Sequence, residues 1–279
     1  MTPRELLRLL TAEFSAAGVP DADVDTALLL SHVTHQPPLN LRLDSWSQVS
    51  PTDEAAFRAL CERRKTRTPL QYLTGVQSFL GRDFHVDERV LIPRPETELL
   101  AERAIDALRT HESPAALDLC CGSGCLAVSM ALAVPSADVH AADLSEGALA
   151  VTGLNADRLG AKITRHQGDL FGALPEGLRF DVIVSNPPYI PADDCRELQA
   201  EVLREPMMAL DGGADGYDFY RRIAAESPRR LKPGGTLLME VGFDQAEGVM
   251  ALCHAAGFPF VTAHEDYQHI LRMVEARLS

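Results

Sequence analysis

The stretch Phe180-Asp-Val-Ile-Val-Ser-Asn-Pro-Pro-Tyr189 decides the fold of this chain. Its first six residues form a largely apolar, β-branched run, which predicts a buried strand. Pro187 and Pro188 cannot continue that strand, because proline lacks an N–H group and pushes the residue before it out of the helical region. The sequence therefore predicts a stiff, extended elbow at the carboxyl end of a strand, where open α/β sheets bind their ligands.

The elbow itself consists of Asn186, Pro187, Pro188 and Tyr189. A side-chain amide oxygen and a backbone carbonyl can accept both hydrogens of a planar NH₂ group, and an aromatic ring can pack on its face. These four residues are therefore candidate catalytic residues that hold a nitrogen about to react. The alternative is an ordinary Pro-rich loop, because Asn-Pro starts many turns.

Length and composition place the chain in a broad class. Its 279 residues predict two domains, and its 46% hydrophobic content allows a sizeable core. No apolar run approaches the ~18 residues of a membrane span, and the first residues mix acids and bases, unlike a signal peptide. The six cysteines lack zinc-ligand spacing and are expected to be core residues. We expect a cytoplasmic protein without a membrane partner.

The charge balance bears on possible partners. The formal net charge is −14, from 40 acidic and 26 basic residues. Such a surface repels phosphate backbones, so it argues against direct binding of nucleic acid. The basic run Arg63-Arg-Lys-Thr-Arg67 is interpreted as a solvated helix end rather than a nucleic-acid patch.

The apolar patterns change along the chain. Residues 1–75 have the spacing of small packed helices, with Thr52 as the expected cap of the third, and the segment 79–92 alternates around a glycine as a β-hairpin does. After residue 114, strands and helices alternate, which indicates a parallel, doubly wound α/β sheet. The expected strands are 115–119, 138–142, 163–167, 180–185 and 235–241, with a last one within 267–275. The expected helices lie near 125–133, 146–158, 215–230 and 245–256.

A glycine-containing turn joins the first of these strands to its helix. It reads Asp118-Leu-Cys120-Cys121-Gly122-Ser123-Gly124. Glycines at such a turn let the backbone approach a ligand and expose helix N–H groups to it. The spacing is not that of a pyrophosphate-binding loop, and Asp118 suits a cationic group better than a phosphate.

Two further acids follow the next two strands. Asp143, followed by Leu144, stands where an acid commonly binds ribose hydroxyls, and Asp169, followed by Leu170, could meet an adenine amino group. Each acid alone is as often a helix cap or a turn residue. Together they describe a nucleoside site with little phosphate recognition, which S-adenosyl-L-methionine fits.

Taken together, these motifs resemble the HemK/PrmC family of class I S-adenosylmethionine methyltransferases, which act on release factors. The stretches that carry the resemblance are Pro69 to Gly75, Leu91 to Glu98, Asp118 to Gly124, Asp143 to Ser145, Gly168 to Phe171, Ser185 to Ile190 and Leu231 to Gly235. The resemblance implies a helical substrate-binding domain (1–75), a β-hairpin linker (76–95) and a Rossmann-like, seven-stranded methyltransferase domain (96–279).

The resemblance also implies an activity. A methyl group would pass from S-adenosyl-L-methionine, leaving S-adenosyl-L-homocysteine, to the N5 side-chain amide nitrogen of the glutamine in the Gly-Gly-Gln motif of peptide chain release factors. Asn186 and the Pro187 carbonyl would hold the amide, Tyr189 would pack against it, and Asn186 would also contact the cofactor. The long segment 190–213 predicts a lid, in which Glu205 would shape the glutamine entrance.

Some positions depart from the family pattern and leave alternatives open. Cys120 stands where the family usually has glycine, and Leu170 where some members have tryptophan. A related group that methylates glutamine on a large-subunit ribosomal protein tends to carry cysteine at the positions of Cys120 and Cys125. The segment Pro93-Arg-Pro-Glu-Thr-Glu98 favours release factors. A DNA adenine methyltransferase and a non-enzymatic binding module remain as further alternatives.

Overall fold

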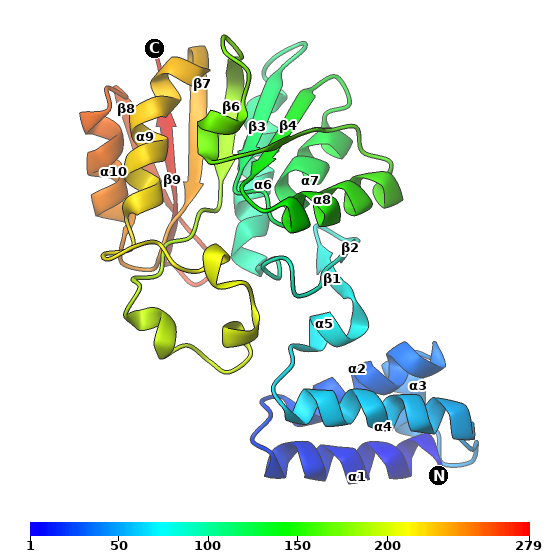
Figure 1. Cartoon of the computed structure of the whole chain (residues 1–279). Helices are drawn as coiled ribbons and strands as arrows, with labels where there is room; N and C mark the ends of the chain where they lie inside the picture. The colour runs from blue at the N-terminus through cyan, green and yellow to red at the C-terminus, as the bar shows by residue number, and fades with distance from the viewer. The chain divides into compact units, whose positions relative to one another are not determined.

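The computed structural model describes all 279 residues, which form two compact units. The first contains residues 1–76 together with 199–204, and the second contains residues 77–198 and 205–279. Figure 1 shows the first unit as a group of helices and the second as a sheet flanked by helices. No helix has the length and apolarity that a membrane span requires.

Five helices build the first unit. They are α1 (Pro3–Ala16), α2 (Ala22–Thr34), α3 (Pro38–Leu43), α4 (Pro51–Lys65) and α5 (Leu70–Thr74). Thr2 begins α1 with a capping box, because its hydroxyl accepts the Glu5 N–H while the Glu5 carboxylate accepts the Thr2 N–H. The cap of α4 is Ser50, which accepts the Asp53 N–H, rather than Thr52 as the sequence pattern suggested.

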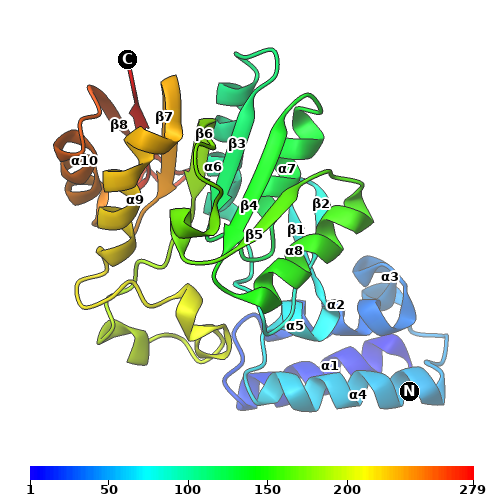
Figure 2. The ribbon, with the colours of Figure 1, turned by 45° about the horizontal axis from the view of Figure 1, so that its top comes forward.

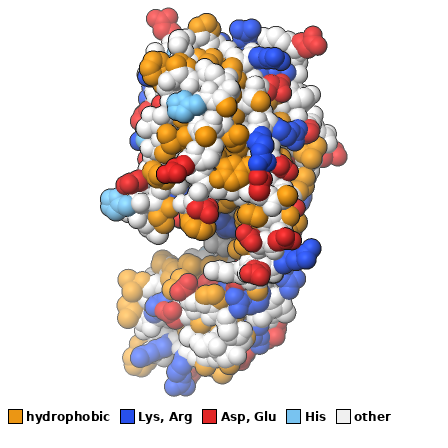
Figure 3. All heavy atoms as spheres, turned by 90° about the vertical axis from the view of Figure 1, so that its left-hand side faces the viewer, with side chains coloured by type: hydrophobic (Ala, Val, Ile, Leu, Met, Phe, Trp, Pro, Cys, Tyr) orange, Lys and Arg blue, Asp and Glu red, His pale blue; other side chains and the backbone are white.

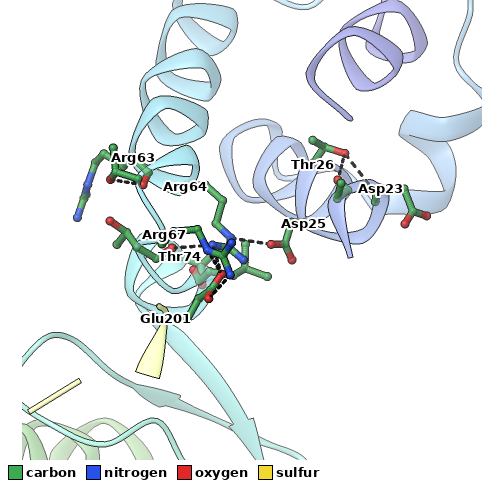
Figure 4. A network of polar contacts seen from close by, with 12 residues as sticks. Asp23, Asp25, Thr26, Arg63, Arg64, Arg67, Thr74 and Glu201 are labelled. Atoms are coloured by element: carbon green, nitrogen blue, oxygen red, sulfur yellow. Dashed lines mark hydrogen bonds and ion pairs between the residues drawn. The ribbon is translucent and has the colours of Figure 1, made fainter. Parts of the chain in front are cut away.

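A buried ion cluster stabilises this unit (Figure 4). The Arg64 guanidinium donates from Nε to Asp25 at 2.7 Å and from Nη1 to Glu201 at 2.9 Å. Arg67 donates to both oxygens of the same Glu201 carboxylate, at 2.7 and 2.6 Å. Residues 199–204 thereby belong to the helical unit, although the sequence placed them inside the methyltransferase domain.

The basic run Arg63–Arg67, at the end of α4, is a solvated helix end only in part, because Arg63 is exposed whereas Arg64 is buried. Arg64 is only 4% exposed, and Lys65 pairs with Glu13 at 3.0 Å. On the face drawn in Figure 3, Lys and Arg side chains lie among Asp and Glu rather than gathering into one basic surface. The sequence suggested solvation because the acids that pair with this run come from distant parts of the chain.

The second unit opens with a hairpin and a long helix. Strands β1 (Val76–Phe79) and β2 (Arg82–His85) turn at Leu80 and Gly81, the glycine around which the hairpin was expected, and α6 (Pro95–Leu108) follows. The hairpin thus spans residues 76–85 rather than 79–92. Pro95 begins α6 at its first position, where the missing N–H is not needed. Glu98 secures the turn of the hairpin, because its Oε1 accepts the Leu80 N–H at 2.8 Å.

The central sheet has seven strands in the order β5-β4-β3-β6-β7-β9-β8. Their bounds are β3 (Ala115–Leu119), β4 (Asp138–Asp143), β5 (Thr164–Gln167), β6 (Phe180–Ser185), β7 (Leu231–Glu240), β8 (Phe260–Glu265) and β9 (Leu271–Arg277). The first five strands are parallel, as predicted, but β9 runs antiparallel to both β7 and β8. The sheet is therefore mixed. The half-exposed strand β8 was missed because it has no apolar run.

Helices cover both faces of the sheet, as Figures 1 and 2 show. One hydrophobic core joins α6, α7 (Cys125–Ala133) and α8 (Glu146–Leu159) to the sheet. A second core joins α9 (Asp218–Arg230) and α10 (Ala246–Ala255) to the other face. Since β6 and β7 are buried between these layers, polar side chains are left to the carboxyl ends of the strands, where the candidate site lies.

Candidate active site

A cavity of about 390 Å³ lies at the carboxyl ends of β3, β4 and β6, wholly within the second unit. This volume is in the range of small-molecule sites. The predicted site residues that line it are Cys120, Gly122, Asp143, Leu144, Asp169, Leu170, Asn186 and Pro188. Four segments far apart in the sequence thus meet at one edge of the sheet.

The glycine-containing turn is held tightly against α8. Gly124 has φ +77°, and a Cβ atom there would lie only 2.7 Å from Cγ2 of Thr152. The Thr152 hydroxyl donates to the Gly122 carbonyl at 2.8 Å, which fixes the turn. Cys120 adopts a left-handed φ of 59°, a conformation that glycine takes more readily. The turn therefore keeps its left-handed form with cysteine in the position that the family gives to glycine.

Asp143 organises two turns around the cavity. Its Oδ2 accepts the Gly122 N–H and its Oδ1 accepts the Ser145 N–H, both at 2.9 Å. Burial raises the pKa of this carboxyl, although the backbone N–H groups of Ser145 and Gly122 oppose the shift. Each carboxylate oxygen has a second lone pair, so Asp143 can accept further hydrogen bonds from a ligand in the cavity.

Asp118 lies beneath the turn rather than in the cavity. Its Oδ2 accepts the Ala127 N–H at 3.0 Å, and its Oδ1 is buried without a partner. Burial raises the pKa of Asp118 to about 8. The structure thus makes Asp118 a support for the first turn of α7. Cys121, Ser123 and Gly124 likewise do not line the cavity.

At the third strand end, Asp169 has a partner that the sequence did not reveal. Arg222 of α9 donates from Nη2 to Asp169 Oδ2 at 2.6 Å, and both side chains line the cavity. Leu170 and Phe219 add apolar surface beside this pair. Sequence reasoning missed Arg222 and Phe219 because α9 lies about fifty residues further along the chain and shows no binding motif.

The elbow divides its four residues between the cavity and the core. Asn186 and Pro188 line the cavity, whereas Pro187 is buried and absent from its lining. The Tyr189 ring packs on the core under α9 and α10, and burial raises the Tyr189 pKa to about 12. Gln245 Nε2 donates to the Tyr189 carbonyl at 2.9 Å. The elbow is therefore anchored at Tyr189, and Asn186 faces the cavity.

The expected lid, residues 190–213, is ordered at its base. The Ile190 N–H donates to the Leu210 carbonyl at 3.0 Å, and the Gly212 N–H donates to the Ile190 carbonyl at 2.8 Å. Glu205 is 5% exposed and accepts the Ile92 N–H at 3.0 Å. Glu205 thus holds the segment before α6 in place, while Pro206 and Met208 line the cavity.

No group of His, Cys, Asp and Glu side chains could hold a metal ion. All six thiols are free, and five of them are buried. Burial raises the pKa of Cys120 above its usual value. The nearby thiols therefore stay protonated, and the residues that face the cavity offer polar contacts and apolar surface for an organic ligand.

Comparison with known proteins identifies the family. Residues 5–75 match the PrmC N-terminal domain, and residues 96–213 match the methyltransferase small domain. A release factor glutamine methyltransferase of Geobacter sulfurreducens is 42% identical over 278 residues, covering 99% of this chain and 97% of the relative. This chain belongs to the release factor glutamine methyltransferase family.

Two further comparisons give a second named activity among the relatives and a solved structure that shares the fold. A ribosomal protein uL3 glutamine methyltransferase of Burkholderia pseudomallei is 40% identical, covering 88% of this chain and 85% of the relative. The T. thermophilus 16S rRNA methyltransferase RsmC, solved with AdoMet and guanosine, has a TM-score of 0.54 at 19% identity. That likeness covers 73% of this chain and 50% of RsmC and shows a shared fold.

Proposed function

We propose that this family member transfers a methyl group from S-adenosyl-L-methionine to the N5 amide nitrogen of the glutamine in the Gly-Gly-Gln motif of peptide chain release factors. The observation that carries the proposal is the meeting of Asn186 and Pro188 with Gly122, Asp143 and Leu170 around one cavity. A nucleoside site and a site for a planar NH₂ group thus share one space. The names of the relatives supply the acceptor.

The cavity residues fit the cofactor. Asp143 can accept hydrogen bonds from ribose hydroxyls, and Leu144 and Leu170 offer apolar surface to an adenine ring. Asp169 is paired with Arg222, so we propose that it reaches the adenine amino group only with its remaining lone pairs. When bound, S-adenosyl-L-methionine supplies the activated methyl group together with its leaving group.

The elbow would orient the acceptor. An amide nitrogen is a weak nucleophile because its lone pair is delocalised into the carbonyl. We propose that Asn186 Oδ1 and the Pro187 carbonyl accept its two N–H bonds and aim the nitrogen at the methyl group, which lowers the barrier through alignment. Tyr189 is anchored in the core, and we propose that it stiffens this arrangement from behind.

The helical unit is proposed to dock the release factor. Its three most exposed large apolar side chains are Leu39 at 66%, Leu43 at 70% and Trp46 at 90%. Tryptophan and leucine side chains brought together on a surface favour protein–protein contact, and tryptophan is enriched among residues that dominate binding energy. No element of this unit carries a catalytic group.

A direct assay would compare acceptors. The full chain is incubated with labelled S-adenosyl-L-methionine and intact release factor, large ribosomal subunits, a short Gly-Gly-Gln peptide or duplex DNA. We expect label in release factor, none after its glutamine is replaced by alanine, and none in DNA. If the helical unit docks the protein, the peptide has a KM at least about tenfold above that of the intact factor.

The acceptor that takes up the label distinguishes between the alternative functions. Preferential labelling of ribosomal subunits would assign the chain to the uL3 activity, consistent with Cys120 and Cys125. Labelling of DNA would contradict the proposed acceptor altogether. Equal KM values for the peptide and the intact factor would remove the docking role from the helical unit.

Asp143→Ala is expected to weaken S-adenosyl-L-methionine binding by about 1.5–3 kcal/mol, the scale of charge-assisted hydrogen bonds. The Asp143 carboxylate both faces the cavity and fixes the Gly122 and Ser145 turns. Calorimetric titration measures the change. Arg222→Ala is the comparison, since it removes a half-exposed cavity side chain whose loss should matter less. An unchanged dissociation constant in Asp143→Ala would mean that other groups hold the ribose.

A further inference from the structure

A buried chain of hydrogen bonds runs from the end of β7 to the elbow. The hydroxyl of Thr97, in the first turn of α6, lies 2.7 Å from Glu240 Oε2, and Asn186 Nδ2 lies 3.3 Å from the Thr97 hydroxyl oxygen. Thr97 is 2% exposed and Glu240 is 4% exposed. Three separate elements, β7, α6 and the segment after β6, therefore meet behind the one elbow side chain that carries an amide.

The chemistry of these groups sets the direction of the chain. An ionised carboxylate only accepts hydrogen bonds, so the Thr97 hydroxyl must give its single hydrogen to Glu240. Thr97 then has only lone pairs left for Asn186, so it can face the amide nitrogen but not the amide oxygen. An amide has one nitrogen and one oxygen, so turning Nδ2 toward Thr97 turns Oδ1 toward the cavity that Asn186 lines.

We propose that Glu240 and Thr97 are positioning residues that hold the Asn186 side chain with Oδ1 facing the acceptor amide. Neither residue lines the cavity, so both act through Asn186. The inference rests on the proposed role of Asn186 and adds the residues that select one of its two amide orientations. Without this bias, the flipped amide would present an N–H group to the acceptor N–H and repel it.

The protonation state of Glu240 should therefore matter. Burial raises the pKa of Glu240 to about 7, although hydrogen bonds from Thr97 and Asn186 and the charge of Arg272 oppose the shift. The other titratable groups that face it are Glu96 of α6, Cys125 of α7, Tyr189 of the elbow and Tyr220 of α9. Protonated Glu240 can donate to Thr97, which frees the Thr97 hydrogen to bind Asn186 Oδ1. The enforced orientation is thus lost as pH falls below about 7.

The test is kcat for a short Gly-Gly-Gln peptide, measured from about pH 6 to about pH 9. Wild-type kcat should rise with pH through the ionisation of Glu240. Thr97→Val should lower the plateau about 10- to 100-fold, the scale of misalignment effects, and flatten the acidic limb. Glu240→Gln should also flatten it, because its side chain no longer titrates. Thr97→Ser keeps the hydroxyl and should recover most of the rate.

The control is Thr236→Val, the same change at a buried position of β7 that takes no part in this chain of bonds. Dissociation constants for S-adenosyl-L-methionine should stay within about twofold in every variant, since neither Thr97 nor Glu240 lines the cavity. The proposal would be overturned if Thr97→Val had the same kcat as the wild type. It would also be overturned if kcat fell at low pH in both Thr97→Val and Glu240→Gln as it does in the wild type.

A second measurement does not depend on methyl transfer. Hydrogen exchange of the Asn186 side-chain NH₂, assigned by its absence in Asn186→Ala, should quicken in Thr97→Val because the bond from Nδ2 is lost. Unchanged exchange would contradict the inferred orientation even if the chain methylates release factor. If the wild type transfers no methyl group but Thr97→Val still quickens the exchange, the proposed function would be wrong and the inferred orientation would remain supported.

Discussion

Asn186→Ala is expected to lower the rate of methyl transfer about 100-fold or more, while S-adenosyl-L-methionine binds within about threefold of wild type. Asn186 lines the cavity from the elbow, whereas Gly122, Asp143 and Leu170, which we propose bind the cofactor, come from other strand ends. Removing the carboxamide should therefore leave the acceptor amide without its orienting contact, while the contacts to the nucleoside remain. Single-turnover transfer to a Gly-Gly-Gln peptide and calorimetry with the cofactor measure the two effects separately.

Asn40→Ala provides the matched control, because Asn40 is an exposed asparagine of α3 in the helical unit. It should methylate the short peptide at the wild-type rate. Transfer by Asn186→Ala at a rate close to wild type would sink the proposed role of the elbow. A large loss of cofactor affinity in the same variant would place Asn186 in the nucleoside site instead.

Arg64→Ala is expected to destabilise the helical unit by about 3–5 kcal/mol, because it leaves buried carboxylates without their cation. Arg64 is 4% exposed and bridges Asp25 and Glu201. Burial raises the pKa of Asp25, against the lowering effect of the Arg64 hydrogen bond and charge. Urea unfolding of the full chain, monitored with a probe on the helical unit, measures the loss of stability.

The sign of the pH dependence follows from Asp25. A folded pKa above the unfolded value means that the native state holds the proton more tightly, so stability falls as pH rises through the folded pKa. Without Arg64 this pKa rises further, and the loss should be larger at about pH 8 than at about pH 5. The comparison variant, Arg67→Ala, removes a side chain that is 27% exposed and should cost about 1 kcal/mol or less.

Loss of Arg64 should also release residues 199–204, which belong to the helical unit. Arg204 then becomes a site for trypsin, since its Nη2 is otherwise bound to the Thr66 carbonyl at 2.8 Å. Equal stability and equal trypsin resistance in Arg64→Ala and Arg67→Ala would show that the cluster contributes little.

Much of the fold was predictable because its signals are local. The strands at 115–119 and 180–185 and the helix at 125–133 were predicted with the bounds that the structure has. Each is a largely apolar run with a glycine or proline within three residues of its end, and such a signal depends on neighbouring residues alone. Strand β8 escaped because a half-exposed edge strand lacks a continuous apolar run, and β9, expected within 267–275, was predicted without its antiparallel direction.

By itself, the sequence determined the chemistry at the strand ends. Two prolines after a buried run make an elbow in any context, and glycines after a strand allow close approach, because both effects come from backbone sterics. Tertiary structure alone decided which polar groups serve the site. Asp118 became a buried support, and Thr97 and Glu240, which are 143 residues apart, came to face Asn186. Such contacts form only when the layers pack, because a buried polar group must find its partner wherever the fold provides one.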